Sequence, residues 1–149
     1  MQSVSVYRFP DRLLVAPNCP TPTGVRLSSE PYTVLPTDTS NRELGAAIEA
    51  ALSISTRTVP HPKDWKAASA PRLTAAGVTS ERAFQQKSTL VQILKSEESI
   101  RIAPSHNGGA AGEARGFHPI ANAEVVVPPM SQSEGIGAEV RRAFEQCTS

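Results

Sequence analysis

Apolar and polar residues alternate along VLPTDTSNRELGAAIEAALSIS (residues 34–55) with the period of an amphipathic helix. One stripe, spaced at i, i+3, i+4, i+7 and i+8, consists of Leu44, Ala47, Ile48, Ala51 and Leu52. This spacing places the five side chains on one face of an α-helix. Ser40 followed three residues later by Glu43 is a capping-box pattern. The sequence therefore predicts that the helix begins at this serine.

The same pattern returns 92 residues further on, in VVPPMSQSEGIGAEVRRAFEQC (residues 126–147), and the two stretches align without a gap. The matching apolar face consists of Ile136, Val140, Ala143 and Phe144. Gly45 aligns with Gly137. A glycine inside a helix costs about 1 kcal/mol relative to alanine. Glycine at both places therefore predicts that the first turn of each helix packs closely against a strand.

Short apolar runs precede each helix and predict strands. In the first half they cover residues 3–9, 13–16 and 32–35, and the turn at residues 10–12 makes a hairpin of the first two. In the second half they cover residues 90–94, 100–104 and 125–127, with a polar turn at residues 95–99. The second strand of each half is expected to stop at a proline, Pro17 or Pro104.

Each half reads strand, turn, strand, loop, strand, helix, so the sequence predicts a tandem duplication. The expected fold class is α+β, with a mostly antiparallel sheet packed by two amphipathic helices. We expect a single domain over residues 1–149. Its parts are repeat unit 1 at about residues 3–55, a short helical insert at about residues 56–87, and repeat unit 2 at about residues 88–149.

The insert has no counterpart in the other half. Its two prolines at positions 60 and 62 hold the backbone extended, so a helix is expected to begin near Lys63 and to end with Gly77 as its C-cap. A second short helix is expected over residues 79–87, capped by Thr79 or Ser80. The insert contains six basic and two acidic residues, and it contains the only tryptophan of the chain, Trp65.

Composition narrows the class of protein. The 149 residues include 15 basic and 14 acidic side chains, so no overall charge favours nucleic acid or a membrane as partner. No apolar run approaches the roughly 18 residues that a membrane span needs. We expect no signal peptide, because no basic segment followed by an apolar stretch begins the chain. Two cysteines form no disulfide framework, which favours a cytoplasmic location.

The sequence predicts neither a metal site nor catalytic residues, and no cofactor is expected. His61, His106 and His118 fall in three separate loops, and no His-x-x-His or Cys-x-x-Cys spacing occurs. No Gly-x-Ser-x-Gly elbow occurs either. The run NGGAAG (residues 107–112) has backbone amides that could bind an anion. It lacks a following Lys-Ser/Thr and opens no helix, so a flexible loop is the better interpretation.

The most distinctive stretch is VPHPKDWK (residues 59–66). A tryptophan flanked by charges is typical of interface anchors. The alternative is that Trp65 fills the core of the insert. We expect the partner-binding residues to be His61, Lys63, Asp64, Trp65, Lys66, His106 and Asn107.

The chain resembles the CdiI immunity proteins of bacterial contact-dependent growth inhibition. The resemblance rests on YRF (residues 7–9), LP leading to LGxxIxxAL (residues 35–52), PHPxDW (residues 60–65) and IG (residues 136–137). It implies a small cytoplasmic protein that binds the C-terminal toxin domain of a cognate exported effector, about one to one. Such toxins are commonly nucleases, and the immunity protein neutralises them by covering the active site or an exosite. The family supplies no catalytic residues and does not fix which positions touch the toxin.

The positive charge of the insert conflicts with the expectation that the insert binds a nuclease toxin. A nuclease toxin is usually basic, so its inhibitor should be acidic, yet the insert is basic. Either the toxin is not strongly basic, or the contact lies on a face bearing Glu97, Glu98, Glu113 and Glu124.

Two other classes stay open from the sequence. A small hydrolase or nucleotide-processing enzyme would use His61, Asp64 and His106 as acid and base groups from facing loops, within about 6 Å of one another. An oligomeric scaffold protein would expose a large apolar patch.

Overall fold

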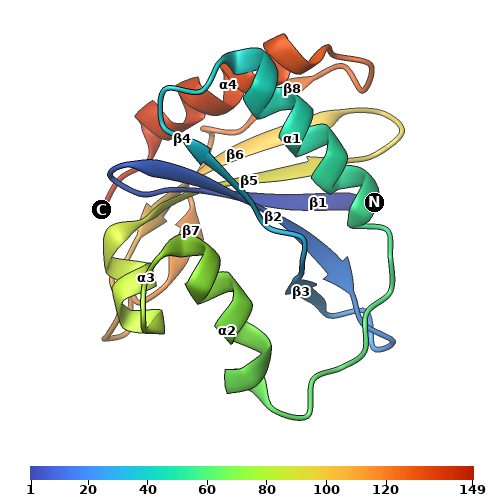
Figure 1. Ribbon diagram of the computed structural model, residues 1–149. Coiled ribbons are helices and arrows are strands. Elements are labelled where there is room, and N and C mark those ends of the chain that lie inside the picture. Colours follow the sequence, from blue (N-terminus) through green and yellow to red (C-terminus); the bar gives the residue numbers. More distant parts are fainter.

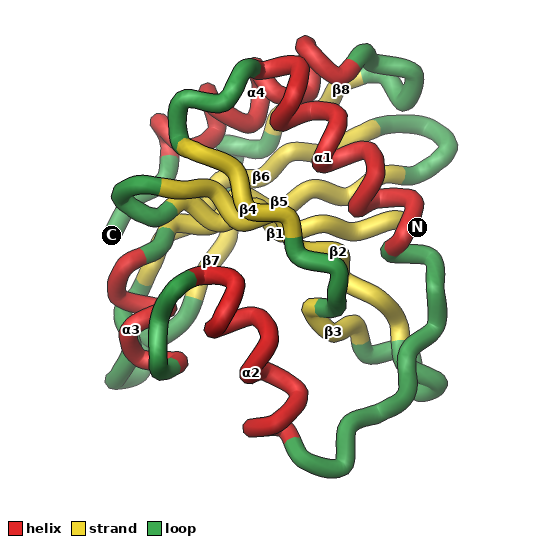
Figure 2. Tube along the Cα trace, viewed as in Figure 1, coloured by secondary structure: helices red, strands yellow, loops and turns green.

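The computed structural model describes residues 1–149, and it has one antiparallel sheet with helices on both faces (Figures 1 and 2). In chain order the elements are β1 (Gln2–Arg8), β2 (Arg12–Pro20), β3 (Arg26–Ser28), β4 (Thr33–Pro36), α1 (Asn41–Ile54), α2 (Trp65–Ala76), α3 (Glu81–Lys87), β5 (Thr89–Lys95), β6 (Ile100–Asn107), β7 (Phe117–Pro119), β8 (Val125–Val127) and α4 (Ser133–Gln146). The predicted α+β class is confirmed.

The sheet is continuous and has eight strands in the order β3-β2-β1-β5-β6-β7, with β4 also pairing with β2 and β8 also pairing with β6. The first strand of each half lies at the centre, where β1 pairs with β5 along its whole length, from Gln2 opposite Lys95 to Arg8 opposite Thr89. Residues far apart in sequence therefore form the middle of the sheet. The two short strands β3 and β7, which the sequence pattern did not reveal, lie at its outer edges.

The expected stops at Pro17 and Pro104 are wrong, because both prolines lie inside longer strands, β2 and β6. Each sits where the outer neighbour of its strand changes. On β2 the partner changes from β4 (residues 12–15) to β3 (residues 18–20), and on β6 it changes from β8 to β7. The Pro17 carbonyl accepts a bond from the Ser29 amide on this outer side. The missing proline N–H therefore faces a gap where no ladder bond is needed.

The two halves have the same order of elements and the same pairing. Leu14 of β2 lies opposite Val34 of β4, and Arg101 of β6 lies opposite Val126 of β8, the corresponding positions of the second half. A duplication as the origin of this arrangement stays a prediction.

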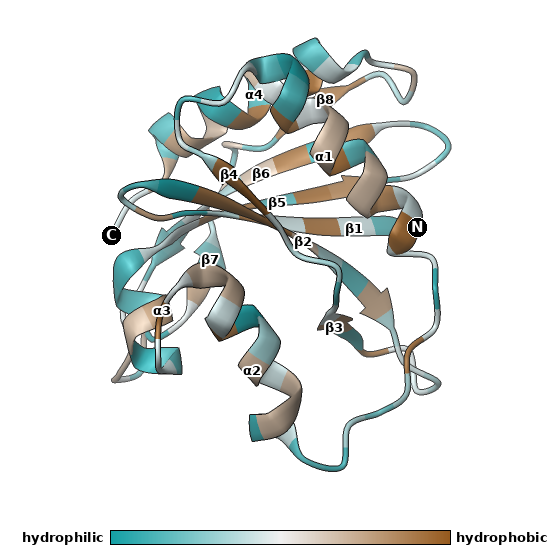
Figure 3. Ribbon diagram, in the orientation of Figure 1, coloured by the Kyte–Doolittle hydropathy of each residue, from teal (hydrophilic) through white to brown (hydrophobic).

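The main core lies between one face of the sheet and the helices α1 and α4 (Figure 3). The inward residues of the four central strands are fully buried there: Val4, Val6, Leu13, Val15, Val91, Ile93, Ile100 and Ile102. They meet the apolar stripes of both helices, including Leu44, Ile48, Ile136 and Phe144. Burial of this apolar surface is the main favourable term in folding. The predicted capping residue Ser40 is confirmed as the N-cap of α1, since its hydroxyl accepts a bond from the Glu43 amide.

The two aligned glycines are explained by contact between helices rather than with a strand. A Cβ added at Gly45 of α1 would lie 1.7 Å from the carbonyl oxygen of Ser133 at the start of α4. A Cβ added at Gly137 of α4 would lie 1.9 Å from the carbonyl oxygen of Asn41 at the start of α1. The first turns of the two helices thus meet backbone against backbone, which only glycine permits. Arg141 of α4 fastens this crossing by donating to the Asn41 side chain at 2.8 Å.

Helices α2 and α3 lie on the opposite face of the sheet (Figure 2). Their apolar contacts are with the first half, and α3 also reaches the end of β6 in the second half. Phe84 of α3 is buried there, with its ring centroid 4.8 Å from Tyr7 and 5.2 Å from Phe9. At the positions of the second half that correspond to Leu14 and Tyr32 stand Arg101 and Glu124, which form an ion pair at 2.9 Å. Apolar residues therefore hold the insert on the first half, while the second half presents charge to solvent.

Substituting either crossing glycine with alanine should destabilise the protein. Gly45→Ala and Gly137→Ala should each lower the free energy of unfolding by about 1–3 kcal/mol, because the helices must separate to admit a methyl group. The measurement is urea unfolding followed by circular dichroism. Gly135→Ala is the matched control, since nothing lies within 4 Å of a Cβ built at that glycine of the same helix. Equal unfolding midpoints for Gly137→Ala and Gly135→Ala would contradict the packing explanation.

Stability should fall at alkaline pH through Tyr7. Burial raises the pKa of its phenol above the ordinary value of 10.0. The contribution of the neutral Tyr7 phenol to the free energy of unfolding is therefore complete below about pH 10. It is lost as the pH rises through the raised pKa of the folded state. Tyr7→Phe retains the ring contacts and should lose less stability between about pH 8 and about pH 11, measured by urea unfolding. The same alkaline loss in both proteins would argue against this role of Tyr7.

Candidate protein-binding surface

Helix α2 begins where the sequence placed the distinctive Trp-containing stretch. The side chain of Asp64 caps it, accepting bonds from the backbone amides of Lys66 at 3.0 Å and Ala67 at 3.2 Å. The predicted C-cap Gly77 ends the helix with a φ of 74°. Ala76 is the only buried residue of α2, and it lies at the C-terminal end. The N-terminal end of α2 therefore projects away from the sheet (Figure 1).

Trp65 stands at this projecting end, and 55% of its surface is exposed. The interpretation that Trp65 fills the core of the insert is therefore wrong; Phe84 fills that core instead. One edge contact orients the indole, because the imidazole of His61 meets it at 5.4 Å between centroids with an interplanar angle of 90°. Trp65 is the only aromatic residue among the exposed large apolar side chains.

Hollows lie on both sides of α2 and share Trp65 as a wall. The smaller, of about 120 Å³, lies between α2, strand β3 and Tyr32, the residue just before β4. Its lining is Leu27, Ser28, Tyr32, Trp65, Ala68, Ser69 and Arg72. The larger, of about 840 Å³, lies between α2 and the start of α3. Its lining is Trp65, Lys66, Ser69, Ala70, Arg72, Leu73, Thr79, Ser80 and Glu81. We call the residues of these two hollows, together with His61 and Lys63, the Trp65 surface.

Arg72 organises the centre of the Trp65 surface. Its guanidinium lies 4.0 Å above the ring of Phe84 and forms an ion pair with Glu81 at 2.5 Å. Burial raises the pKa of the neighbouring Tyr32 phenol, and the Arg72 charge opposes that shift. A half-exposed aromatic ring, a cation held in place and hollows on both sides are typical of protein-recognition surfaces.

The predicted cations Lys63 and Lys66 are exposed and take part in no ion pair. The carboxylate of Asp64 is used by the helix cap, which leaves the projecting end of α2 with positive charge. Lys66 lines the larger hollow beside Trp65. The structure thus brings His61, Asp64, Trp65 and Lys66 together at one end of α2.

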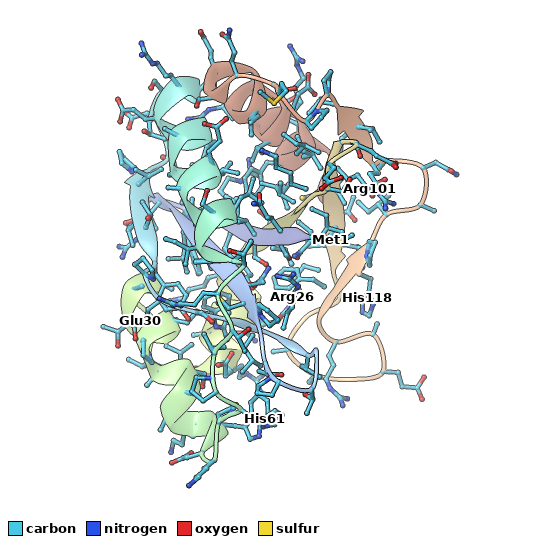
Figure 4. All side chains as sticks on the ribbon, turned by 90° about the vertical axis from the view of Figure 1, so that its right-hand side faces the viewer. Met1, Arg26, Glu30, His61, Arg101 and His118 are labelled. Carbon is cyan, nitrogen blue, oxygen red and sulfur yellow. The ribbon has the colours of Figure 1, made fainter.

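The structure does not bring His106 and Asn107 to the Trp65 surface. They end strand β6, where His106 lies opposite His118 of β7, so the expectation that these two histidines lie in loops is wrong. The Nδ1 atom of His106 is bonded to the Thr148 hydroxyl at 2.7 Å. Figure 4 shows His61 and His118 on different elements, well apart. The Asn107 side chain is buried and donates to the carbonyl oxygens of Gln85 and Ser88 at 2.7 and 2.8 Å. Its observed contacts are internal, and its role in binding a partner remains a prediction.

The structure does not bring together the three residues that the alternative function, a small hydrolase or nucleotide-processing enzyme, would use as acid and base groups. His61 packs on Trp65, Asp64 caps α2, and His106 bonds Thr148 in another part of the molecule. No group of three or more His, Cys, Asp or Glu side chains is placed to hold a metal ion. Burial raises the pKa of the Cys147 thiol, which disfavours the nucleophilic thiolate. None of the helices has the length and apolar character to cross a membrane.

The four acidic residues considered as an alternative contact face do not form one cluster. Glu97 and Glu98 lie in the turn between β5 and β6, and Glu113 lies in the loop between β6 and β7. The carboxylate of Glu124 is paired with Arg101.

Sequence reasoning missed Arg72, Tyr32 and Leu27 as parts of this surface. Arg72 is separated from Trp65 by two helical turns, a spacing that could have placed both on one side of α2. Leu27 and Tyr32 come from a different part of the chain, and no local pattern links them to α2.

An exposed aromatic side chain on a projecting helix is typical of proteins that bind other proteins. The chain belongs to the CdiI family of CDI immunity proteins, whose family model matches residues 30–147. No curated protein sequence matches the chain.

Two solved structures share the fold. One is the "Protein of Unknown Function NMB0488 from Neisseria meningitidis", with 18% identity and a TM-score of 0.73 over 98% of this chain and 94% of that chain. The other is the "CdiA-CT/CdiI toxin and immunity complex from Yersinia pseudotuberculosis", with 18% identity and a TM-score of 0.73 over 99% of this chain and 97% of that chain.

The cap role of Asp64 leads to a prediction about α2. Asp64→Ala should expose the amides of Lys66 and Ala67 and cost about 1 kcal/mol, because two helix-start donors lose their acceptor. Hydrogen exchange at these two amides should become faster, while exchange in α1 stays the same. Asp64→Asn is the control, since asparagine is an equally good cap. Unchanged exchange in Asp64→Ala would refute the cap assignment.

Proposed function

We propose that this protein binds the C-terminal toxin domain of a cognate contact-dependent growth inhibition effector, about one to one, and neutralises it in the cytoplasm. We further propose that the toxin is a nuclease and that inhibition requires binding alone, with no reaction catalysed by the immunity protein. Membership of the CdiI family supports the immunity role. The solved neighbour from Yersinia pseudotuberculosis, described as a toxin and immunity complex, has the same fold.

The single structural observation behind the proposed contact is the exposed Trp65 between two hollows. An exposed tryptophan at a site with depressions on both sides can be desolvated by a partner, and such residues often dominate binding energy. Its contact with His61 restricts the ring before binding, so less side-chain entropy is lost on association. The neighbouring Lys63 and Lys66 would add long-range attraction and speed the encounter.

The sheet provides the rigid base that such an anchor needs. The two cores fix the strands, and α2 is attached to them at its C-terminal end through Ala76 and Leu73. A toxin that covers the N-terminal end of α2 would contact a projecting surface without disturbing the main core. Binding of this kind would block the toxin by covering its active site or an exosite.

The first test is direct binding. The candidate toxin domain to express is the C-terminal part of the protein encoded by the gene immediately upstream. Titration calorimetry with this chain should give a one-to-one complex with a dissociation constant in the nanomolar range. Expression of the chain should restore growth of cells that make the toxin. Failure to bind and to protect would refute the proposed function.

Trp65→Ala should weaken toxin binding at least tenfold, a loss of about 1.4 kcal/mol or more, because a desolvated aromatic anchor is removed. Calorimetry and a growth-protection assay measure the effect. Stability should change little, since more than half of the side chain is exposed.

Met130→Ala is the control for Trp65→Ala, because Met130 is 88% exposed and lies in the loop before α4. Helix α4 packs on the face of the sheet opposite α2. If both variants bind the toxin like the wild type, the contact lies away from the Trp65 surface, and this part of the proposal is wrong. The immunity role would then rest on another face.

A further inference from the structure

A third, polar hollow lies between α3 and the glycine-rich loop that joins β6 to β7. Its volume is about 400 Å³. The lining residues are Glu81, Arg82 and Gln85 of α3 and Gly109, Ala110, Arg115 and Gly116 of the loop. Glu81 also lines the larger hollow beside Trp65. The polar hollow therefore continues the Trp65 surface across α3.

Two arginines reach this hollow from different elements, and neither charge is neutralised. Arg82 and Arg115 are both exposed, and no carboxylate pairs with either of them. The Arg115 side chain makes one bond, from Nη1 to the Gly112 carbonyl at 3.1 Å, within its own loop. The only carboxylate of the lining, that of Glu81, is already paired with Arg72 at 2.5 Å. Glu113 lies in the same loop but does not line the hollow.

Backbone hydrogen bonds close the base of the loop that presents Arg115. The Gly108 amide donates to the Gly116 carbonyl at 2.8 Å, and the Gly116 amide donates to the Gly109 carbonyl at 3.0 Å. A Cβ added at Gly108 would lie 1.5 Å from the Ala114 carbonyl oxygen, so the chain closes on itself tightly there. The expected flexibility of residues 107–112 stays a prediction, and these bonds lie at the base of that loop.

The buried Asn107 connects this loop to α3. Its Oδ1 accepts from the Gly109 amide at 2.9 Å and from the Gln85 side chain at 2.8 Å, while its Nδ2 donates to the Gln85 and Ser88 carbonyls. Asn107 thus acts as a positioning residue that sets the distance between the two walls of the hollow. The two guanidinium groups are presented on a preformed frame.

We propose that this hollow binds a carboxylate side chain of the toxin domain, so that the toxin surface facing α2 and α3 is acidic. The inference rests on the proposed function and adds the kind of partner surface. Guanidinium groups bind carboxylates through paired, charge-assisted hydrogen bonds. Lys66 adds positive charge to the neighbouring hollow, beside Trp65.

A protein carboxylate fits this hollow better than a nucleic-acid backbone. The chain has 15 basic and 14 acidic residues, so no strong overall field attracts a polyanion. Lys66, Arg82 and Arg115 line hollows beside α2 and α3, and Lys66 lies next to an exposed tryptophan. This resolves the conflict between a basic insert and a basic toxin: the recognised face of the toxin is acidic, whatever its net charge.

The test is titration calorimetry of the toxin domain with Arg82→Glu and Arg115→Glu, at low and at moderate salt. Each charge reversal should weaken binding ten- to a hundredfold at low salt, because a like charge then faces the toxin carboxylate. The wild-type complex should weaken as salt is raised, and both variants should show a smaller salt dependence. Both arginines are exposed, so thermal unfolding of the variants should match the wild type.

Arg42→Glu is the matched control. Arg42 is also exposed and unpaired, but it lies on α1, on the opposite face of the sheet. The control should bind the toxin within about twofold of the wild type. In addition, replacing one acidic residue of the toxin with lysine should restore binding to Arg115→Glu, which a merely structural role of Arg115 would not allow.

The outcomes separate this inference from the proposed function. If the wild type binds and protects, but Arg82→Glu and Arg115→Glu bind like Arg42→Glu, the carboxylate site is refuted and the immunity role stands. If the wild type does not bind the toxin, both fail together. If a fluorescently labelled single-stranded RNA binds the wild type and loses binding in the two variants, the hollow is a nucleic-acid site and the inference is overturned.

Discussion

The close crossing of α1 and α4 is the contact on which the rest of the structure depends. Gly45 and Gly137 let the first turns of the helices meet backbone against backbone, so both helices fit over one face of the sheet. Each helix belongs to a different half of the chain. The crossing and the central pairing of β1 with β5 therefore hold the two halves together from two sides. A side chain at either of these two positions would push the helices apart, and the apolar stripes containing Leu44 and Ile136 could then not pack in one core.

The opposite face of the sheet is covered differently, by the helices α2 and α3, and these helices carry the proposed binding surface. Phe84 packs against Tyr7 and Phe9 and secures α3, whereas α2 is secured at its C-terminal end alone. A helix held at one end presents the other end, with Trp65 and its hollows, to a partner. The corresponding positions of the second half have no apolar contact with a helix, because Arg101 and Glu124 form an exposed ion pair there. The single insert thus makes a nearly symmetric scaffold asymmetric, and it gives the molecule one distinctive face (Figure 1).

Much of the fold follows from local sequence. The 3.6-residue stripe, the Ser40 cap and the Gly77 C-cap determine where helices begin and end, because these signals act within one or two turns. The same reasoning found six of the eight strands. It missed β3 and β7, which have three residues each and no periodic signal. It also stopped two strands at Pro17 and Pro104, since a proline is neutral only where the neighbouring strand is missing, and that is a property of the sheet.

By itself the sequence determined the α+β class, the two aligned helices, the basic insert and the choice of Trp65 as the distinctive residue. Only the tertiary structure decided that Trp65 is exposed while Phe84 is buried, because the pattern of α2 does not say which end of the helix meets the sheet. Only the tertiary structure shows that His106 lies away from His61 and that the Asn107 side chain makes internal hydrogen bonds. It also places Arg82 and Arg115 at the same hollow. Contacts of this kind join residues tens of positions apart, and their free energy depends on a backbone arrangement that no local pattern specifies.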